Sequence, residues 1–214
     1  MASWAEYKAH LRNKEFLISV LAGFLLLILS VVINFYAGIY TVERASNYVT
    51  DIVLSNTEVM DVDWIFIYGS FIFWLFVAVL CLMKPNRVPF ALKSIALFVL
   101  IRSIFISLTH LGPFPDQIYI NPESIINKFT SGADLFFSAH TGLPFLMALT
   151  FWNQKVLRIF FLTSSVVFGA VVLLGHLHYS IDVLSAFFIT YTIFHLSEIA
   201  FAKERALFLN GLNV

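Results

Sequence analysis

The chain has 214 residues, of which 60% are hydrophobic and 12% are charged, and its mean hydropathy is +0.88. Charged residues approach a quarter of the total in water-soluble domains, so this composition indicates an integral membrane protein. Thirteen Lys and Arg balance thirteen Asp and Glu, which leaves no basic field to hold nucleic acid. The single cysteine, Cys81, excludes internal disulfides and cysteine-rich metal sites.

Long apolar stretches predict one all-α membrane domain, a bundle of six transmembrane helices. A segment of about 20 apolar residues is long enough to cross a bilayer as a helix. Gly175 and the polar residues that follow it indicate a tight turn between the last two spans. Residues 1–15 are expected to be a cytoplasmic interfacial segment. The predicted spans cover residues 16–40, 64–83, 90–111, 135–152, 156–174 and 178–200.

Lys and Arg gather in alternate loops, as the positive-inside rule requires for six spans. Only Arg44 and Lys128 fall in the loops opposite to the main group. On this basis both termini are cytoplasmic, and the longer loops 41–63 and 112–132 face the outer side of a multi-pass membrane protein. The cytoplasmic group comprises Lys8, Arg12, Lys14, Lys84, Arg87, Lys155, Arg158, Lys203 and Arg205, with Lys93 nearby.

Ionisable residues inside a membrane are costly unless they are paired or hydrated, so each of them is a candidate for function. His195 and Glu198 map near the cytoplasmic end of the last span and are expected to be interfacial. The others map to the outer half or outer ends of their predicted helices. They are Arg102, Asp134, His140, His176, His178 and Asp182.

The spacing of His178 and Asp182, i and i+4, predicts that their side chains meet on one helical face. A carboxylate that accepts the proton of one imidazole nitrogen fixes the tautomer and leaves the other nitrogen free as nucleophile or base. A purely structural His–Asp bond would have the same spacing. A second histidine, His140, enters from the same side and, when protonated, suits the protonation of a leaving alkoxide.

Two further groups would complete a phosphate site. Arg102 would supply a fixed cation, because guanidinium holds phosphate through two hydrogen bonds. Backbone amides between Ser138 and Thr141, at the start of the fourth predicted helix, would add anion-binding N–H groups. Displacement at phosphorus by two histidines needs no metal, so neither a metal nor a cofactor is expected.

Three segments carry a family resemblance. Residues 137–141 (Phe-Ser-Ala-His-Thr) and 178–183 (His-Tyr-Ser-Ile-Asp-Val) resemble the two catalytic motifs of sphingomyelin synthases, a branch of the type-2 phosphatidic acid phosphatase superfamily. Residues 102–115 resemble the arginine-to-threonine-to-proline motif of that branch. The resemblance covers residues 102–201, the expected catalytic half of the chain.

The resemblance implies roles for individual residues. His178 would be the nucleophile or base, Asp182 its orienting carboxylate and His140 the general acid on the leaving lipid alcohol. Arg102 and Asp134 would be supporting residues. The chain departs from the family at Ala139, which replaces a glycine and adds a methyl group where the backbone approaches phosphate.

The motifs of the phosphatase branch are missing. Lys84 and Arg87 have the wrong spacing and side for its Lys-x6-Arg-Pro motif, and Val171 and Val172 replace its Ser-Arg pair. A phosphodiester carries one negative charge and needs fewer cations than a monoester dianion, so Arg102 alone favours a phospholipid diester. The expected reaction passes a phospho-headgroup from a phospholipid to a lipid alcohol such as ceramide or diacylglycerol, or to water.

Several alternatives stay open from the sequence. The first is a lipid phosphate phosphatase of the same superfamily, and a more distant one is a proton- or ion-coupled transporter. A metal enzyme that uses His140, His176, His178 and Asp182, or a purely structural role, is less favoured. The compact length resembles bacterial members and predicts a bacterial cytoplasmic membrane protein. The expected partners are the bilayer, the phospholipid substrate and the lipid alcohol acceptor, and a homo-oligomer is left open.

Overall fold

The computed structural model describes residues 4–117 and 135–212, and their regular structure is helical. The elements follow in the order α1 (Trp4–Arg12), α2 (Lys14–Arg44), η1 (Leu54–Asn56), η2 (Ile65–Gly69), α3 (Ser70–Met83), η3 (Pro85–Arg87), α4 (Val88–Leu108), α5 (Ala139–Thr150), α6 (Lys155–Leu174), α7 (Ser180–Ala200) and α8 (Ala202–Asn210).

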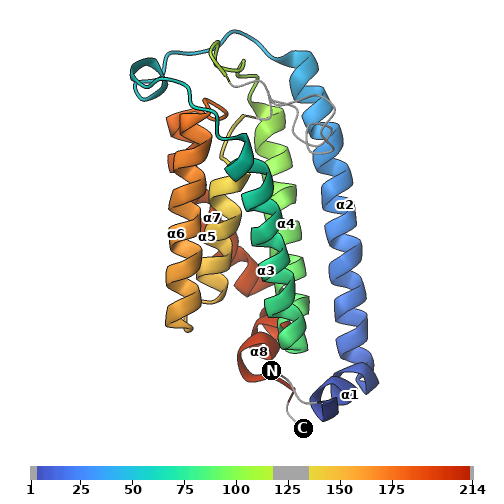
Figure 1. Cartoon of the computed structure of the whole chain (residues 1–214). Coiled ribbons are helices and arrows are strands. Elements are labelled where there is room, and N and C mark those ends of the chain that lie inside the picture. The colour runs from blue at the N-terminus through green and yellow to red at the C-terminus, as the bar shows by residue number, and fades with distance from the viewer. Residues whose placement is uncertain (1–3, 118–134, 213–214) are drawn as a thin grey trace.

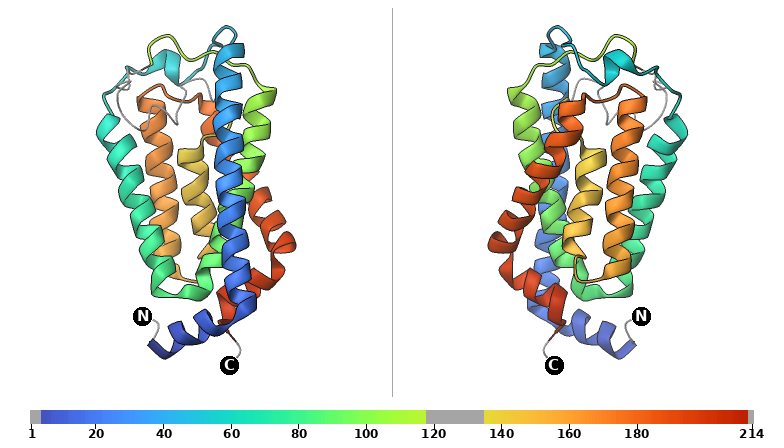
Figure 2. Two further views of the ribbon diagram at one scale, coloured as in Figure 1. Left: turned by 90° about the vertical axis from the view of Figure 1, so that its right-hand side faces the viewer. Right: turned by 90° about the vertical axis from the view of Figure 1, so that its left-hand side faces the viewer.

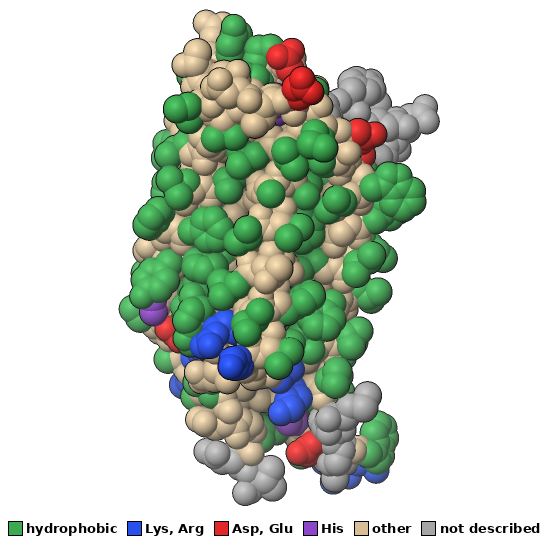
Figure 3. Space-filling model, turned by 60° about the vertical axis from the view of Figure 1, so that its left-hand side comes forward, with side chains coloured by type: hydrophobic (Ala, Val, Ile, Leu, Met, Phe, Trp, Pro, Cys, Tyr) green, Lys and Arg blue, Asp and Glu red, His purple; other side chains and the backbone are tan. Residues whose placement is uncertain are grey.

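Five helical segments are long and apolar enough to cross a membrane: Lys14–Arg44, Ile65–Met83, Pro85–Leu108, Lys155–Leu174 and Ser180–Ala200. They run along a common axis, and the chain ends near 4 and 212 lie at the same end of the bundle (Figures 1 and 2). We call this the terminal end and the other the loop end. Lys and Arg appear toward the terminal end below a broad apolar surface, and acidic side chains are visible at both ends (Figure 3).

The predicted fourth span, 135–152, is where the structure departs most from the sequence prediction. Its helix, α5, has only 12 residues, so a sixth crossing of full length is not shown. The preceding residues are irregular, with positive φ angles at Phe136 (126°) and Phe137 (20°). Non-helical backbone at membrane depth is tolerated where protein buries it, and Leu135, Phe137 and Ser138 are all buried.

Other boundaries differ less. α2 continues to Arg44, beyond the predicted end at residue 40, and the third long segment begins at Pro85 and ends at Leu108. A short helix, α1, forms within the predicted interfacial segment. The turn predicted after Gly175 is present, since α6 ends at Leu174 and α7 begins at Ser180. His176 turns the chain there with a φ of 54°, which side chains other than glycine rarely adopt.

Aromatic side chains form the core on which α5 rests. Phe98 and Phe137 pack edge to face with ring centroids 5.4 Å apart, and both are fully buried. Gly142 lets α5 approach α4 and α7, because a Cβ atom there would lie 2.8 Å from both the Phe98 ring and Thr190 Oγ1. Close packing of Gly142 against the Phe98 ring and Thr190 holds the short helix α5 in the middle of the bundle.

Candidate functional site

The His178 and Asp182 side chains meet at the loop end of the bundle. His178 Nδ1 lies 3.1 Å from Asp182 Oδ2, and both side chains are buried. The pair does not share a helical face as predicted, because His178 lies in the turn two residues before α7 begins. The contact forms because Asp182, in the first turn of α7, also accepts a hydrogen bond from Tyr179 N at 3.1 Å. One carboxylate oxygen therefore caps the helix and orients the imidazole.

A residue that the sequence analysis did not single out secures this turn from outside. Asp51 Oδ2, in the loop between α2 and η2, accepts hydrogen bonds from Ser180 N and Ser180 Oγ, both at 2.8 Å. Burial raises the pKa of Asp51, but hydrogen bonds from Ser180, Leu54 and Val53 outweigh it, so the pKa lies below its ordinary value. An anionic side chain at a helix N-terminus also interacts favourably with the helix dipole.

Tyr179 adds a second tie between this turn and the loop segments. Its hydroxyl donates to Gly112 O at 2.8 Å and accepts from Val49 N at 3.3 Å. Burial, the largest cause, raises the pKa of Tyr179, so its hydroxyl is a neutral donor at neutral pH. The His178 turn is thus held by segments that lie far away in the sequence.

His140 is the second residue of α5 and lines a cavity of about 320 Å³ between α3, α5 and α6. Its ring lies 4.1 Å from the Phe66 ring, centroid to centroid, at an interplanar angle of 30°. Ser70, Trp74 and Phe168 are among the other lining residues, whereas His178 and Asp182 are not. The structure places His140 in a largely aromatic setting that is open to one side of the bundle.

The backbone ties the start of α5 to the first turn of α7. Ser138 N donates to Asp182 O at 3.0 Å, which brings the two predicted catalytic segments together. Ser138 also caps α5, since its Oγ accepts from Thr141 N at 3.4 Å. The Ser138 and Thr141 amides therefore donate hydrogen bonds within the protein. Both side chains are fully buried.

Arg102, on α4, is buried beside this junction. Its Nε donates to Phe137 O at 3.3 Å, and Nη1 lies 3.5 Å from Asn34 Oδ1 on α2. The Phe137 carbonyl directly precedes the α5 cap, so Arg102 stabilises the irregular backbone that leads into α5. The structure thus gives the guanidinium a positioning contact that its sequence pattern did not indicate.

Asp134 and His176 are the remaining predicted residues. Asp134 lies outside the described residues. His176 faces Phe114, with ring centroids 5.3 Å apart, and its Nε2 lies 3.4 Å from Thr57 Oγ1. Within residues 4–117 and 135–212, no group of three or more His, Cys, Asp or Glu is placed to hold a metal ion.

Comparison with known proteins gives one match. Residues 132–199 match the family model described as PAP2 superfamily C-terminal, which is less than half of the 214-residue chain but includes both histidine motifs. No curated protein and no solved structure matches the chain. The match does not distinguish the sphingomyelin synthase branch from others. The segment that carries His140, His178 and Asp182 is thus similar to the C-terminal domain of the PAP2 superfamily.

Proposed function

We propose that this protein is a membrane-embedded lipid phosphotransferase or phosphatase that uses His178 as its nucleophile. The observation that carries the proposal is the 3.1 Å contact between His178 Nδ1 and Asp182 Oδ2, within the segment that matches the PAP2 superfamily. With Nδ1 directed to a carboxylate, Nε2 is the nitrogen left to attack, and Asp182 stabilises the charge that develops on the ring.

The proposed reaction has two steps. His178 Nε2 attacks phosphorus and forms an N–P bond, the P–O bond to the lipid alcohol breaks, and protonated His140 gives its proton to the leaving oxygen. An acceptor hydroxyl then attacks phosphorus, the N–P bond breaks, and His140 takes the acceptor's proton. A lipid alcohol as acceptor gives a new phospholipid, and water gives hydrolysis.

A continuous apolar surface beside His140 supports a lipid substrate. A groove of about 490 Å³ between α2, α3 and α4 is lined by apolar side chains, including Phe24, Ala78 and Leu92. It shares Trp74 and Leu143 with the His140 cavity. An acyl chain in this groove would therefore end near the cavity, with its phosphate ester toward His140.

The proposal also includes the class of donor lipid, a sixth membrane crossing and the orientation of the chain. We take the donor to be a phosphodiester lipid, because Arg102 is the one arginine that the sequence places at this site. We take α5 together with residues 135–138 to form a sixth crossing, since the chain returns to the terminal end through α5. Both termini are then cytoplasmic, and the His178 turn faces the outer side.

The test is product analysis with purified protein in nanodiscs. Labelled phosphatidylcholine, phosphatidylethanolamine and phosphatidic acid are supplied with and without ceramide or diacylglycerol, and chelator is added in parallel. His178→Ala is compared with His195→Ala, because His195 Nδ1 also lies 3.1 Å from a carboxylate, Glu198, but near the other end of α7. The two variants remove the same kind of pair at opposite ends of one helix.

A new headgroup-bearing lipid that survives chelator, disappears in His178→Ala and persists in His195→Ala supports the transferase. Free phosphate from phosphatidic acid, with the same dependence on His178, identifies a phosphatase with the same nucleophile. Activity that survives His178→Ala overturns the proposal. Labelling of single cysteines at Asp116 and at Lys203 in intact cells checks the orientation, and reaction of the Lys203 position alone from outside would reverse it.

A further inference from the structure

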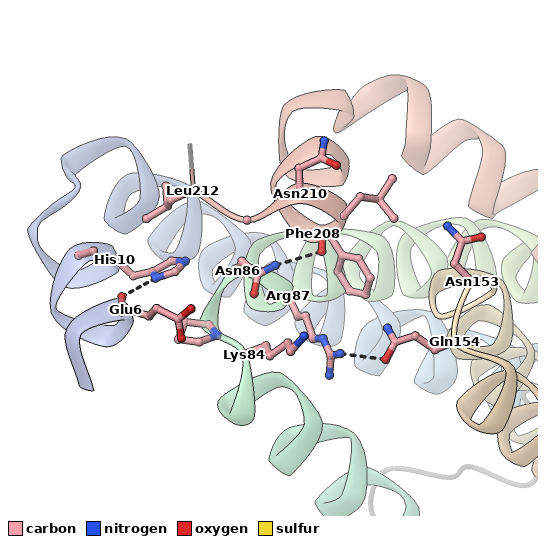
Figure 4. Close-up of a pocket in the computed structure, with 14 residues that line it drawn as sticks. Glu6, His10, Lys84, Asn86, Arg87, Asn153, Gln154, Phe208, Asn210 and Leu212 are labelled. Atoms are coloured by element: carbon pink, nitrogen blue, oxygen red, sulfur yellow. Dashed lines mark hydrogen bonds between the residues drawn. The ribbon is translucent and has the colours of Figure 1, made fainter. Parts of the chain in front are cut away.

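A second polar site lies at the terminal end of the bundle, away from the His178 turn. A pocket of about 740 Å³ opens between α1, η3, α8 and the connection from α5 to α6. We call it the terminal pocket (Figure 4). Its lining includes Glu6, His10, Lys84, Arg87, Gln154 and Asn210.

The floor of the terminal pocket carries a buried positive charge. Arg87 is 7% exposed, and it donates from Nη1 to Leu80 O at 3.1 Å and from Nη2 to Gln154 Oε1 at 3.0 Å. Both acceptors are neutral, and no carboxylate within the described residues pairs with Arg87. Lys84, three residues earlier and exposed, adds a second cation to the lining. A buried guanidinium without an anion favours binding of one.

His10 provides an independent sign of a ligand. Its Nδ1 lies 2.7 Å from Glu6 O, while its Nε2 is buried and has no hydrogen-bond partner. The side chain is 7% exposed, and its ring points from α1 toward Asn86 (Figure 4). Buried polar atoms are nearly always hydrogen-bonded, so an unpartnered imidazole nitrogen at a pocket wall indicates a group that binds there.

The walls are fixed before any ligand arrives. Asn86 Nδ2 donates to Leu207 O at 3.1 Å and to Phe208 O at 3.0 Å, which holds α8 against η3. Figure 4 shows the contact to Phe208 together with the bond from Arg87 to Gln154. A pocket whose cation is already oriented loses little entropy on binding.

We propose that the terminal pocket binds the phosphate group of a phosphorylated polyol. Lys84 and Arg87 would hold the phosphate, because charge-assisted hydrogen bonds from cations are the strongest contacts it forms. His10 donates from Nδ1 to Glu6 O, so its Nε2 would accept a hydrogen bond from a hydroxyl group of the polyol. Asn153 and Asn210 would bind further hydroxyl groups of the polyol. The same chemistry occurs in a free polyol phosphate and in the headgroup of a lipid such as phosphatidylglycerol.

The experiment has two arms, both in a His178→Ala background so that no turnover or binding by the proposed nucleophile interferes. In the first, glycerol 3-phosphate is titrated calorimetrically into protein in phosphatidylcholine nanodiscs. In the second, retention of phosphatidylglycerol by the protein is measured by native mass spectrometry. Lys84→Gln and His10→Phe are the test variants. Lys155→Gln is the matched control, because Lys155 is exposed at the same end but does not line the pocket.

Saturable binding in either arm that is about tenfold weaker in both test variants, and unchanged in Lys155→Gln, supports the proposal. The arm that shows it identifies the source of the phosphate. Equal weakening by Lys155→Gln shows only diffuse attraction to surface charge and overturns the proposal, as does absence of binding in both arms at millimolar ligand. Lys84 is exposed, so its substitution tests the site without disturbing the fold.

Discussion

The Asp51 carboxylate oxygen Oδ2 accepts two hydrogen bonds from one residue, Ser180 N and Ser180 Oγ, each at 2.8 Å. Ser180 is the first residue of α7, the helix that carries Asp182. A loop between the first two long helices therefore fixes the start of the helix that orients His178. The two residues are 129 positions apart in the sequence, so this contact connects a distant segment of the chain to the proposed site.

Substitution of Asp51 by Asn should lower stability in a pH-dependent way. The folded protein holds the pKa of Asp51 below its ordinary value of 3.8, so the ionised carboxylate stabilises the fold above that value. This stabilisation is lost as the pH falls through the lower, folded pKa. We expect Asp51→Asn to cost about 1–2 kcal/mol near neutral pH, from weakened hydrogen bonds. Thermal unfolding of both proteins between neutral and acidic pH measures this loss of stability. A difference between the two proteins that does not change with pH would contradict the prediction.

Replacement of Asp182 by Asn should reduce turnover by about a hundredfold or more, because an amide cannot stabilise a charged imidazole and permits the wrong tautomer. Asp182→Glu, which retains the charge, should recover part of the rate. Initial rates at saturating lipid measure the effect, and Glu198→Gln is the matched control beside His195. An equal loss in Glu198→Gln would point to general destabilisation of α7.

Filling the apolar groove should affect long-chain lipids selectively. Ala78 is exposed and lines the groove, so Ala78→Phe should raise KM for long-chain substrates more than for short-chain analogues. Ala170→Phe is the control, because Ala170 is also exposed but lies on α6 outside the groove. The same response to both variants would argue against acyl-chain binding between α2, α3 and α4.

Addition of a methyl group at Gly142 should destabilise the bundle. A Cβ atom there would lie 2.8 Å from Phe98 and from Thr190 Oγ1, so the packing of α5 must shift, at a cost of about 1–3 kcal/mol. The loss is measured as a lower midpoint of unfolding for Gly142→Ala. Gly69→Ala, whose nearest contact would be the Phe168 ring at 3.3 Å, should cost less. The opposite order would show that α5 adjusts more easily than this packing suggests.

The stability contributed by a partly buried ion pair near the terminal end should depend on both partners. Glu204 pairs with Lys93 and accepts from Ser19 Oγ at 2.7 Å. Burial raises the pKa of Glu204, but the hydrogen bonds from Lys93 and Ser19 outweigh this effect, so the pKa lies below its ordinary value. The ionised pair is therefore present at neutral pH. Glu204→Gln should cost up to about 3 kcal/mol, because it leaves the Lys93 charge without its partner.

The double variant Lys93→Met with Glu204→Gln should recover part of that loss, since no unpaired charge then remains. Denaturant unfolding of the two single variants, Glu204→Gln and Lys93→Met, and of the double variant gives the coupling between the residues as a double-mutant cycle. Simple additivity of the two single effects would mean that the pair contributes nothing beyond its separate side chains.

The sequence predicted helices where apolar runs were long, and the structure agrees for five of them. Over 135–152 only Ala139–Thr150 is helical, because hydropathy indicates the apolar character of the residues before α5 and not the positive φ angles of Phe136 and Phe137. The spacing of His178 and Asp182 predicted a contact between them, and the contact is present. The structural reason given for it was wrong. The contact depends on a cap at the start of α7 and not on a shared helical face.

The residues that hold the site from outside could not be predicted. Asp51 was one of several acidic residues in a loop, and no local pattern connects it with Ser180. Arg102 was predicted as a phosphate ligand because it is an arginine within an apolar span and its guanidinium could hold a phosphate. Its observed bond to Phe137 O depends on an irregular backbone that the sequence did not reveal.

The shortness of α5 sets the depth at which the proposed chemistry occurs. Its 12 residues rise about 18 Å, against a hydrocarbon thickness of about 30 Å. In the proposed six-span arrangement α5 runs to the terminal end of the bundle, so the helix starts inside the hydrocarbon layer. A phosphate ester that reaches His140 must leave the aqueous layer, and its charge is then screened much less than in water. The hydroxyl that accepts the transferred group must reach the same depth in the bilayer. Lipid alcohols already reside at that level, whereas water must be admitted.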